Sequence, residues 1–152
     1  MIRLALVSDS HGRGDTLKAA AGGMEGCEGL CHLGDLVPDG QRMSQMLGLP
    51  LYGVRGNCDG WENAPEEMVL NVAGHKLLLC HGHRYGVKES LTRLYLRGQE
   101  AGADIVLYGH THQPRVDRNG PMMLINPGAL MNGRWAVLEF REMGPVPVMK
   151  IL

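Results

Sequence analysis

Five apolar segments of this chain each run directly into a short loop that combines glycine with aspartate, asparagine or histidine. The first is LALV at 4–7, which is followed by Asp9 and His11. The other four loops carry Gly34 and Asp35, then Gly56, Asn57, Cys58 and Asp59, then His81, Gly82 and His83, and finally Gly109, His110, Thr111 and His112. Of the seven histidines, only His32 and His75 lie outside these loops. Histidines scattered over a core and a surface would not gather in this way, so the pattern constrains both fold and function.

The first third of the chain alternates between strand and helix patterns. Strands are expected at 2–7, 29–35 and 50–57, and helices at 15–24 and 39–48. This alternation indicates βαβ units and a parallel sheet.

Strand patterns dominate the remainder. Two strands joined by a tight turn at Ala73 and Gly74 are expected within 66–82, and another buried strand at 104–112. A meander is expected over 114–126, 133–140 and 146–152, with turns at Asn119 and Gly120 and at Asn132 and Gly133. Two sheets packed face to face with helices outside would satisfy this order.

The longest helix is expected at 86–102. Its pattern places Val87, Leu91, Leu94 and Tyr95 on one face.

Size and charge limit the classes of function. The chain has 152 residues, 44% of them hydrophobic and 20% charged, so we expect one globular domain over residues 1–152. The net charge of -1 provides no overall field for nucleic acid or an anionic membrane. No segment approaches the ~20 apolar residues of a membrane span, and the first run is too short for a signal peptide. We therefore expect a cytoplasmic protein without membrane association.

The four cysteines lie in or beside apolar stretches. They are Cys27, Cys31, Cys58 and Cys80. Without a secretion signal, reduced thiols are expected rather than disulfides.

The polar loops have the chemistry of a metal site. The carboxyl ends of parallel strands face one crevice, and glycine lets neighbouring side chains converge there. Imidazole with carboxylate or amide oxygen suits borderline transition metals, and a mixed set fits two ions that share a carboxylate. A single Asp-x-His is more typical of a turn or a helix N-cap. Five such loops at successive strand ends favour metal binding.

The motifs DSH, GD, GNCD, HGH and GHTH, in this order, resemble those of the calcineurin-like metallophosphoesterases. The INPGA stretch at 125–129 and the small size are most similar to the YfcE-type phosphodiesterase branch. The resemblance runs from about residue 2 to residue 130. It implies a four-layer αββα sandwich, in which two mixed β-sheets pack face to face and helices lie outside.

The resemblance also implies two divalent metal ions that share Asp35. The first would be bound by Asp9, His11, Asp35 and His112. The second would be bound by Asp35, Asn57, His81 and His110. Family members use manganese, iron, zinc, nickel or cobalt; we expect manganese, although the ligands exclude none of these metals.

The implied reaction is two-metal hydrolysis of a phosphoester. Ions about 3.5–4 Å apart lower the pKa of a bridging water, and the resulting metal-bridging hydroxide attacks in line. Asn57 would bind metal and also donate to the phosphoryl group. His83 matches no metal position and is expected to face the substrate or support the ligands, with simple loop packing as the alternative.

Cys58 departs from the wider superfamily. Many members have a histidine at this position, which is thought to protonate the leaving group, whereas the YfcE-type branch often has cysteine. We expect Cys58 to lie against the substrate, but a thiol is a poor acid unless its pKa is perturbed.

Three further residues are expected to have structural roles only. His32 is expected to be a hydrogen-bonded buried histidine that supports the Gly-Asp motif, and His75 to be exposed at a hairpin turn. Asn126 is expected to begin a backbone turn near the site.

The predicted function is that of a metal-dependent phosphodiesterase or phosphatase. The alternative is a non-catalytic scaffold, because the retromer subunit of this fold resembles these enzymes yet binds partners. The chain leaves little room for a capping domain, so we expect an open site for small phosphoesters, with nucleic acid restricted to short or cyclic nucleotides. The ten methionines and the apolar tail suit either a core or an interface, which leaves a homo-oligomer open.

Overall fold

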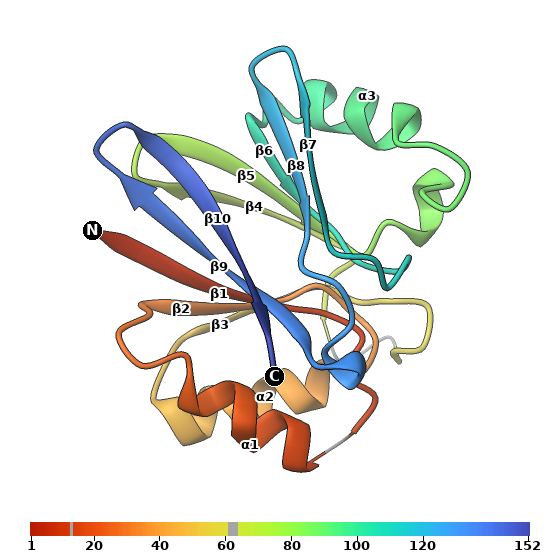
Figure 1. Ribbon diagram of the computed structural model, residues 1–152. Helices are drawn as coiled ribbons and strands as arrows, with labels where there is room; N and C mark the ends of the chain where they lie inside the picture. Colours follow the sequence, from red (N-terminus) through yellow and green to blue (C-terminus); the bar gives the residue numbers. More distant parts are fainter. Residues whose placement is uncertain (13, 61–63) are drawn as a thin grey trace.

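The computed structural model describes residues 1–12, 14–60 and 64–152, which form two five-stranded sheets packed face to face (Figure 1). The first sheet has the order β10-β9-β1-β2-β3. Its strands are β1 (Ile2–Val7), β2 (Gly29–His32), β3 (Leu51–Gly53), β9 (Arg134–Arg141) and β10 (Gly144–Ile151). The second sheet has the order β4-β5-β6-β8-β7. Its strands are β4 (Glu67–Val72), β5 (His75–Cys80), β6 (Ile105–Leu107), β7 (Arg115–Asn119) and β8 (Met122–Asn126).

Helices cover the outer faces of both sheets. The parallel strands β1, β2 and β3 are connected by α1 (Gly14–Gly22) and α2 (Val37–Leu47), which lie on the outer face of the first sheet (Figure 1). The outer face of the second sheet is covered by α3 (Thr92–Glu100). Both sheets contain parallel and antiparallel pairs, so the predicted four-layer αββα sandwich is confirmed.

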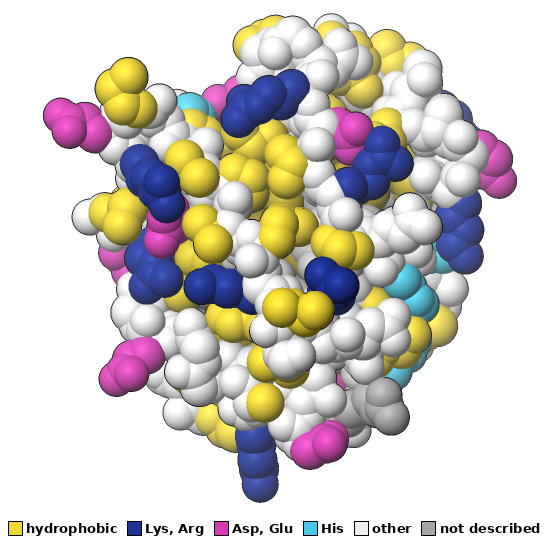
Figure 2. Space-filling model, in the orientation of Figure 1, with side chains coloured by type: hydrophobic (Ala, Val, Ile, Leu, Met, Phe, Trp, Pro, Cys, Tyr) yellow, Lys and Arg dark blue, Asp and Glu magenta, His cyan; other side chains and the backbone are white. Residues whose placement is uncertain are grey.

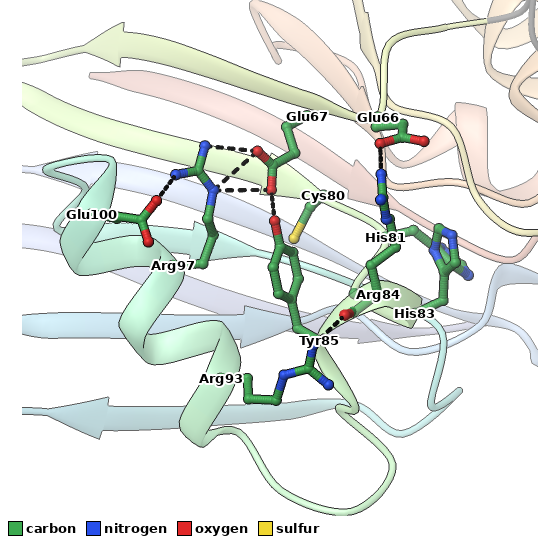
Figure 3. Close-up of a pocket in the computed structure, with 11 residues that line it drawn as sticks. Glu66, Glu67, Cys80, His81, His83, Arg84, Tyr85, Arg93, Arg97 and Glu100 are labelled. Carbon is green, nitrogen blue, oxygen red and sulfur yellow. Dashed lines mark hydrogen bonds and ion pairs between the residues drawn. The ribbon is translucent and has the colours of Figure 1, made fainter.

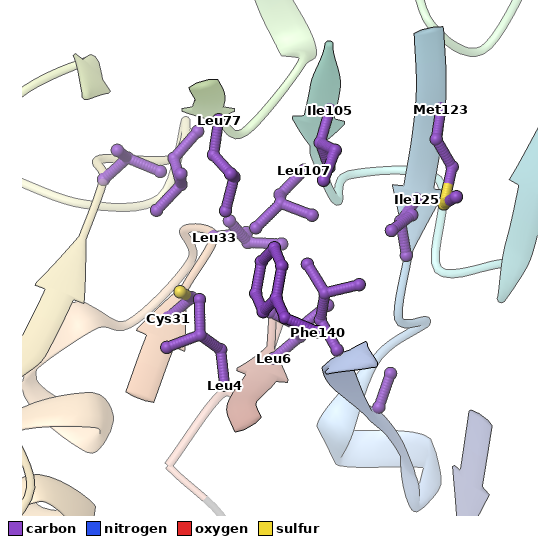
Figure 4. Close-up of a cluster of buried hydrophobic side chains, with 14 residues drawn as sticks. Leu4, Leu6, Cys31, Leu33, Leu77, Ile105, Leu107, Met123, Ile125 and Phe140 are labelled. Carbon is purple, nitrogen blue, oxygen red and sulfur yellow. The ribbon is translucent and has the colours of Figure 1, made fainter. Parts of the chain in front are cut away.

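The main core lies between the two sheets (Figure 4). Strand β1 shows why its sequence is apolar throughout: Leu4 and Leu6 point into this core, whereas Ala5 and Val7 pack under α1 and α2. Successive side chains of a strand point to opposite faces, so a strand buried on both sides needs a continuous apolar run. The same requirement explains the apolar runs of β2, β5 and β6, whose ends carry the polar loops.

The predicted helix at 86–102 is wrong in its first half. The chain forms a short 3₁₀ helix, η1 (His83–Tyr85), then a turn, and α3 begins only at Thr92. Gly82 precedes η1 with φ of 100°, and Gly86 ends η1 with φ of 58°, a left-handed backbone that stops a helix from continuing. Val87 still packs with Leu94 in one buried cluster, although it lies outside α3. At eleven residues, α2 is longer than α3.

The predicted meander is also wrong. The hairpin of β7 and β8 belongs to the second sheet, whereas the hairpin of β9 and β10 belongs to the first. The turns at Asn119 and Gly120 and at Asn132 and Gly133 are both confirmed. The second closes a 3₁₀ helix, η2 (Leu130–Asn132), which carries the chain from one sheet to the other.

All four cysteines are free thiols, as predicted. Burial raises the pKa of the Cys31 thiol to about 12. Among the described residues, no helix combines the length and the apolar character needed to cross a bilayer.

His32 is fully buried at the end of β2, and its two ring nitrogens are both hydrogen-bonded, as expected. Its Nδ1 accepts the Gly34 N–H at 3.2 Å, so the neutral ring carries its proton on Nε2, which lies 3.0 Å from Ser10 Oγ. The Ser10 hydroxyl in turn donates to the Asp35 carbonyl at 3.4 Å. His32 therefore supports the backbone of two polar loops, and burial lowers its pKa to about 4.

This burial predicts a loss of stability in acid. The unfolded chain takes up a proton at His32 below about pH 6.5, whereas the folded protein resists it until about pH 4. The free energy of unfolding should therefore fall by about 2 kcal/mol through His32 between pH 7 and pH 5. Urea denaturation of wild type and His32→Gln in a chelating buffer at pH 7 and pH 5 measures the part of this change in the free energy of unfolding that is due to His32. Glutamine keeps a donor and an acceptor but does not titrate, so an equal pH dependence in the two proteins contradicts the prediction.

Candidate metal centre

The loops that follow β1, β2, β5 and β6 bring six of the seven predicted metal ligands to one edge of the sandwich. They are Asp9, His11, Asp35, His81, His110 and His112. Asp9 Oδ1 lies 3.2 Å from His112 Nε2 and 3.8 Å from His81 Nε2. Asp35 Oδ2 lies 3.5 Å from His81 Nε2 and 3.9 Å from His11 Nε2. These separations connect the carboxylates and imidazoles into one cluster.

Two groups of ligand atoms are close enough to hold an ion. The atoms of Asp9, His11 and His112 lie within 4.8 Å of one another, as do those of Asp9, Asp35 and His81. Asp9 is thus common to both groups, whereas the resemblance assigns the shared role to Asp35. Because Asp35 Oδ2 approaches both His11 and His81, both carboxylates lie between the two groups.

Asp9 has one oxygen without a hydrogen-bond donor. Its Oδ2 accepts the Ser8 hydroxyl at 2.6 Å and the His110 N–H at 3.2 Å. Its Oδ1 is buried, and no donor among the described residues bonds to it. A buried carboxylate oxygen without a partner is costly unless a cation compensates it. The donor set therefore fits a metal ion at Asp9 Oδ1.

The orientation of His81 suits a ligand. Its Nδ1 donates to the Leu33 carbonyl at 2.7 Å, so Nε2 faces Asp9 and Asp35. A backbone hydrogen bond of this kind fixes the tautomer and ring direction of a metal-binding histidine. His110 Nδ1 lies 3.2 Å from His81 Nε2, so the two rings converge on the same point.

The charges of the cluster are interdependent. Burial raises the pKa of Asp9. Burial also opposes ionisation of Asp35, but its hydrogen bond with His81 and the His81 charge hold the Asp35 pKa below its usual range. Against burial, Asp35 and Asp9 raise the pKa of His81. The two carboxylates therefore favour a proton on His81, and a divalent ion bound here would compete with that proton.

The ligands occupy an unusual backbone conformation. Asp9, His11, Asp35, His110 and His112 have φ between 51° and 71°. This left-handed region is uncommon for residues other than glycine, and its cost is sustained where surrounding contacts enforce it. It turns each side chain sharply back towards the common point.

A glycine permits the closest approach between two of the loops. A Cβ at Gly34, which has φ of 106°, would lie 2.6 Å from His81 Nδ1. The glycine of the GD motif is therefore required for the loop after β2 to pack against the His81 ring.

Asp59 holds the loop that carries Asp35. Its carboxylate accepts the N–H groups of Asp35, Leu36, Val37 and Gly56 at 2.7 to 2.9 Å. These bonds also cap α2, whose N-cap residue Leu36 has no side-chain cap. The sequence suggested no role for Asp59 because capping is normally local, and this carboxylate comes from 22 to 24 residues further along the chain.

Asn126 does more than begin a turn. Its amide nitrogen donates to the Gly109 carbonyl at 3.1 Å and the Thr111 hydroxyl at 3.0 Å, and its oxygen accepts the Gly128 N–H. It thereby fixes the loop that carries His110 and His112.

Three predicted residues lie at the rim of the cluster. Asn57 and Cys58 are exposed, and the Asn57 amide lies 3.8 Å from Cys58 Sγ. The Cys58 N–H donates to Asp35 Oδ1 at 3.0 Å, which fixes this loop beside the cluster. The contacts of the described residues do not connect the Asn57 side chain itself with the other ligands. The His83 ring lies 5.4 Å from that of His81.

The expectation of an exposed His75 is wrong. His75 begins β5, is partly buried, and its Nδ1 lies 2.5 Å from Asp104 Oδ2. Its ring packs 5.8 Å from that of Phe140.

Comparison with known proteins gives consistent matches. The family model for the calcineurin-like phosphoesterase superfamily domain matches residues 2–140. The probable metallophosphoesterase YsnB of Bacillus subtilis is 31% identical over 130 residues, which cover 85% of this chain and 75% of YsnB. Phosphodiesterase YfcE of Escherichia coli is 30% identical over 158 residues, which cover 86% of this chain and 80% of YfcE. The crystal structure of Vps29 complexed with zinc from Entamoeba histolytica covers 99% of both chains with a TM-score of 0.78, and its 17% identity shows the fold alone.

The role of Asp59 predicts the effect of its removal. Asp59→Ala leaves four backbone N–H groups without their acceptor and should lower the free energy of unfolding by about 2–4 kcal/mol. Asp59→Asn keeps one acceptor oxygen and should lose roughly half as much. Urea denaturation measures both variants, with Asp117→Ala as a control on strand β7. An Asp59→Ala protein as stable as wild type would show that water replaces these hydrogen bonds.

Proposed function

The chain belongs to the calcineurin-like phosphoesterase superfamily, and we propose that it is a metal-dependent phosphodiesterase. The observation that carries the proposal is the buried Asp9 Oδ1, which has no hydrogen-bond donor within residues 1–12, 14–60 and 64–152 and lies 3.2 Å from His112 Nε2 and 3.8 Å from His81 Nε2. A carboxylate oxygen in these surroundings is placed to bind a cation, because it makes no hydrogen bond that would stabilise the fold.

The proposed ligands follow the family motif. The first ion takes Asp9, His11, Asp35 and His112. The second takes Asp35, Asn57, His81 and His110. The short distances among six of these residues support the assignment, and Asn57 rests on the resemblance. Two divalent ions, with manganese expected, would supply Lewis-acid activation of the phosphoryl group and of a water molecule.

The chain's own residues would bind and orient the ester. The exposed amide of Asn57 is a donor for a phosphoryl oxygen, where negative charge develops during attack. Burial and the neighbouring charge of His81 lower the pKa of His83. His83 is therefore neutral near pH 7, where it acts as a hydrogen-bond donor to the substrate rather than as a strong acid.

Cys58 is unsuited to proton transfer. Burial and the Asp35 charge raise the pKa of its thiol. A raised pKa makes the thiol a weaker acid than an ordinary cysteine. The leaving oxygen must then depart largely without a proton from the protein.

A non-catalytic metal-binding module of the same fold is the second candidate. The observation that favours it is the fold shared with Vps29 complexed with zinc. Metal binding alone does not separate the two candidates, so the deciding assay is hydrolysis of small phosphodiesters with added manganese. Absence of hydrolysis in protein that holds its metal would favour the module.

The shared ligand predicts metal stoichiometry. Asp35→Ala should abolish hydrolysis and lower occupancy of both sites, because the carboxylate would touch both ions. His112→Ala should deplete mainly the first site and His81→Ala mainly the second. Elemental analysis after gel filtration measures the ions per chain, and Asp117→Ala should keep both. Two tightly held ions in Asp35→Ala would rule out the shared role.

The Cys58 environment predicts a steep dependence on the leaving group. Aryl phosphodiesters should be hydrolysed far faster than alkyl esters, since general acid catalysis typically contributes about 10²–10⁴-fold and aryl groups need it least. Cys58→His should narrow the gap, and Cys58→Ala should change little. The measurement is kcat/KM across esters of graded leaving-group pKa. A flat dependence in wild type, with alkyl activity lost in Cys58→Ala, would identify the thiol as the acid.

A further inference from the structure

A pocket of about 580 Å³ opens beside the metal centre (Figure 3). Its inner end is formed by His81 and His83, and its outer end by α3. The volume is typical of sites for small organic ligands. The pocket is therefore continuous with the reaction centre and large enough for the organic part of an ester.

The carboxylates that line this pocket already have cationic partners. Glu67 accepts three hydrogen bonds from Arg97, at 2.8, 3.1 and 3.3 Å (Figure 3). The same guanidinium pairs with Glu100 at 3.0 Å. Glu66 pairs with Arg84 and with Arg55. Each acidic group of the pocket is thus neutralised by arginine.

Arg93 is the exception among the cations of the pocket. Its guanidinium donates to the Arg84 carbonyl at 3.1 Å, and no carboxylate of the described residues lies within 4 Å of it. The bond to the carbonyl positions the guanidinium and leaves other N–H groups available. Arg93 also lies in the first turn of α3, where the helix dipole adds positive potential.

His83 lies between this pocket and a smaller one. The smaller pocket, about 160 Å³, is lined by residues that include His83, His110, Lys88 and Glu89. The ammonium of Lys88 has no ion-pair partner among the described residues, and its charge contributes to the lowered pKa of His110. Lys88 and Glu89 carry opposite charges, so the smaller pocket adds little net charge beside His83, and the positive charge available to a ligand lies at Arg93 of the larger pocket.

We propose that the larger pocket binds the leaving group of the substrate, and that Arg93 binds a second anionic group carried by that leaving group. This inference rests on the proposed phosphodiesterase function and adds a substrate class to it. The substrates would be phosphodiesters whose leaving alcohol bears a phosphate, phosphonate or carboxylate. Arginine suits such groups because its fork of N–H donors matches their oxygens. Tyr85, in the same pocket, offers an aromatic surface to the body of the leaving group.

The test uses three matched aryl methyl phosphodiesters. Their leaving phenols carry a para phosphonomethyl, carboxymethyl or ethyl group, and the methylene insulates the phenol so that leaving-group pKa stays similar. The measurement is the ratio of kcat/KM for each anionic ester to that of the ethyl ester, with added manganese. Wild type should prefer at least one anionic ester by about tenfold or more, since a charged hydrogen bond is of this strength.

Substitution of the guanidinium should remove that preference. Arg93→Gln should bring the ratio close to one, and Arg93→Lys should keep part of it. The control is Arg115→Gln, which removes an arginine that pairs with Asp117 at 2.7 Å outside this pocket, and which should keep the wild-type ratio. The two anionic esters distinguish phosphonate from carboxylate as the preferred group.

A binding measurement provides a readout independent of turnover. Calorimetric titration of 4-(phosphonomethyl)phenol into metal-free protein should show binding that weakens by about tenfold or more in Arg93→Gln. Equal binding by both proteins, or none, overturns the inference.

The outcomes separate the two proposals. Hydrolysis of the ethyl ester with a ratio near one in wild type overturns the leaving-group pocket and leaves the phosphodiesterase intact. No hydrolysis of any of the three esters in metal-loaded protein overturns both.

Discussion

Two carboxylates at the edge of a buried sheet set the constraint on which this structure depends. Asp9 and Asp35 are buried beside each other, and one oxygen of Asp9 has no donor among the described residues. Such groups need positive charge close by. Protonation of His81, which the carboxylates favour, would supply part of this charge, and divalent ions would supply more. The fold therefore holds buried negative charge that a bound cation would compensate.

The surrounding loops bear the conformational cost of placing these side chains together. Left-handed backbone at the ligand positions is unfavourable, and it persists because hydrogen bonds from outside each loop enforce it. Asp59 fixes the Asp35 loop through four N–H groups, Asn126 fixes the loop of His110, and His32 supports the backbone at Gly34. The sandwich below is apolar, so these polar contacts fix the loops that carry the predicted ligands.

The sequence was sufficient to predict which residues gather in the cluster, but it did not predict the residues that support them. Apolar runs that end in Asp9, Asp35, His81 and His110 predict both strands and site, because the carboxyl ends of parallel strands share one edge. The acceptor role of Asp59 depends on a contact across more than twenty residues, which has no local pattern. The placement of the β7–β8 hairpin in one sheet and the β9–β10 hairpin in the other likewise depends on packing between distant residues, which has no local pattern.

The failed helix prediction has a functional consequence. A continuous helix from residue 86 would leave no turn between β5 and α3, and its polar side chains would lie along one helix face. Instead the left-handed glycines at 82 and 86 bend the chain, so that the Arg84 carbonyl meets the Arg93 guanidinium and His83 remains beside the ligands. The same bend creates the pocket between β5 and α3. Sheet edges position the metal ligands, whereas this glycine-dependent turn shapes the surface that a substrate would meet. The features proposed here to determine specificity are therefore those that helical periodicity describes least well.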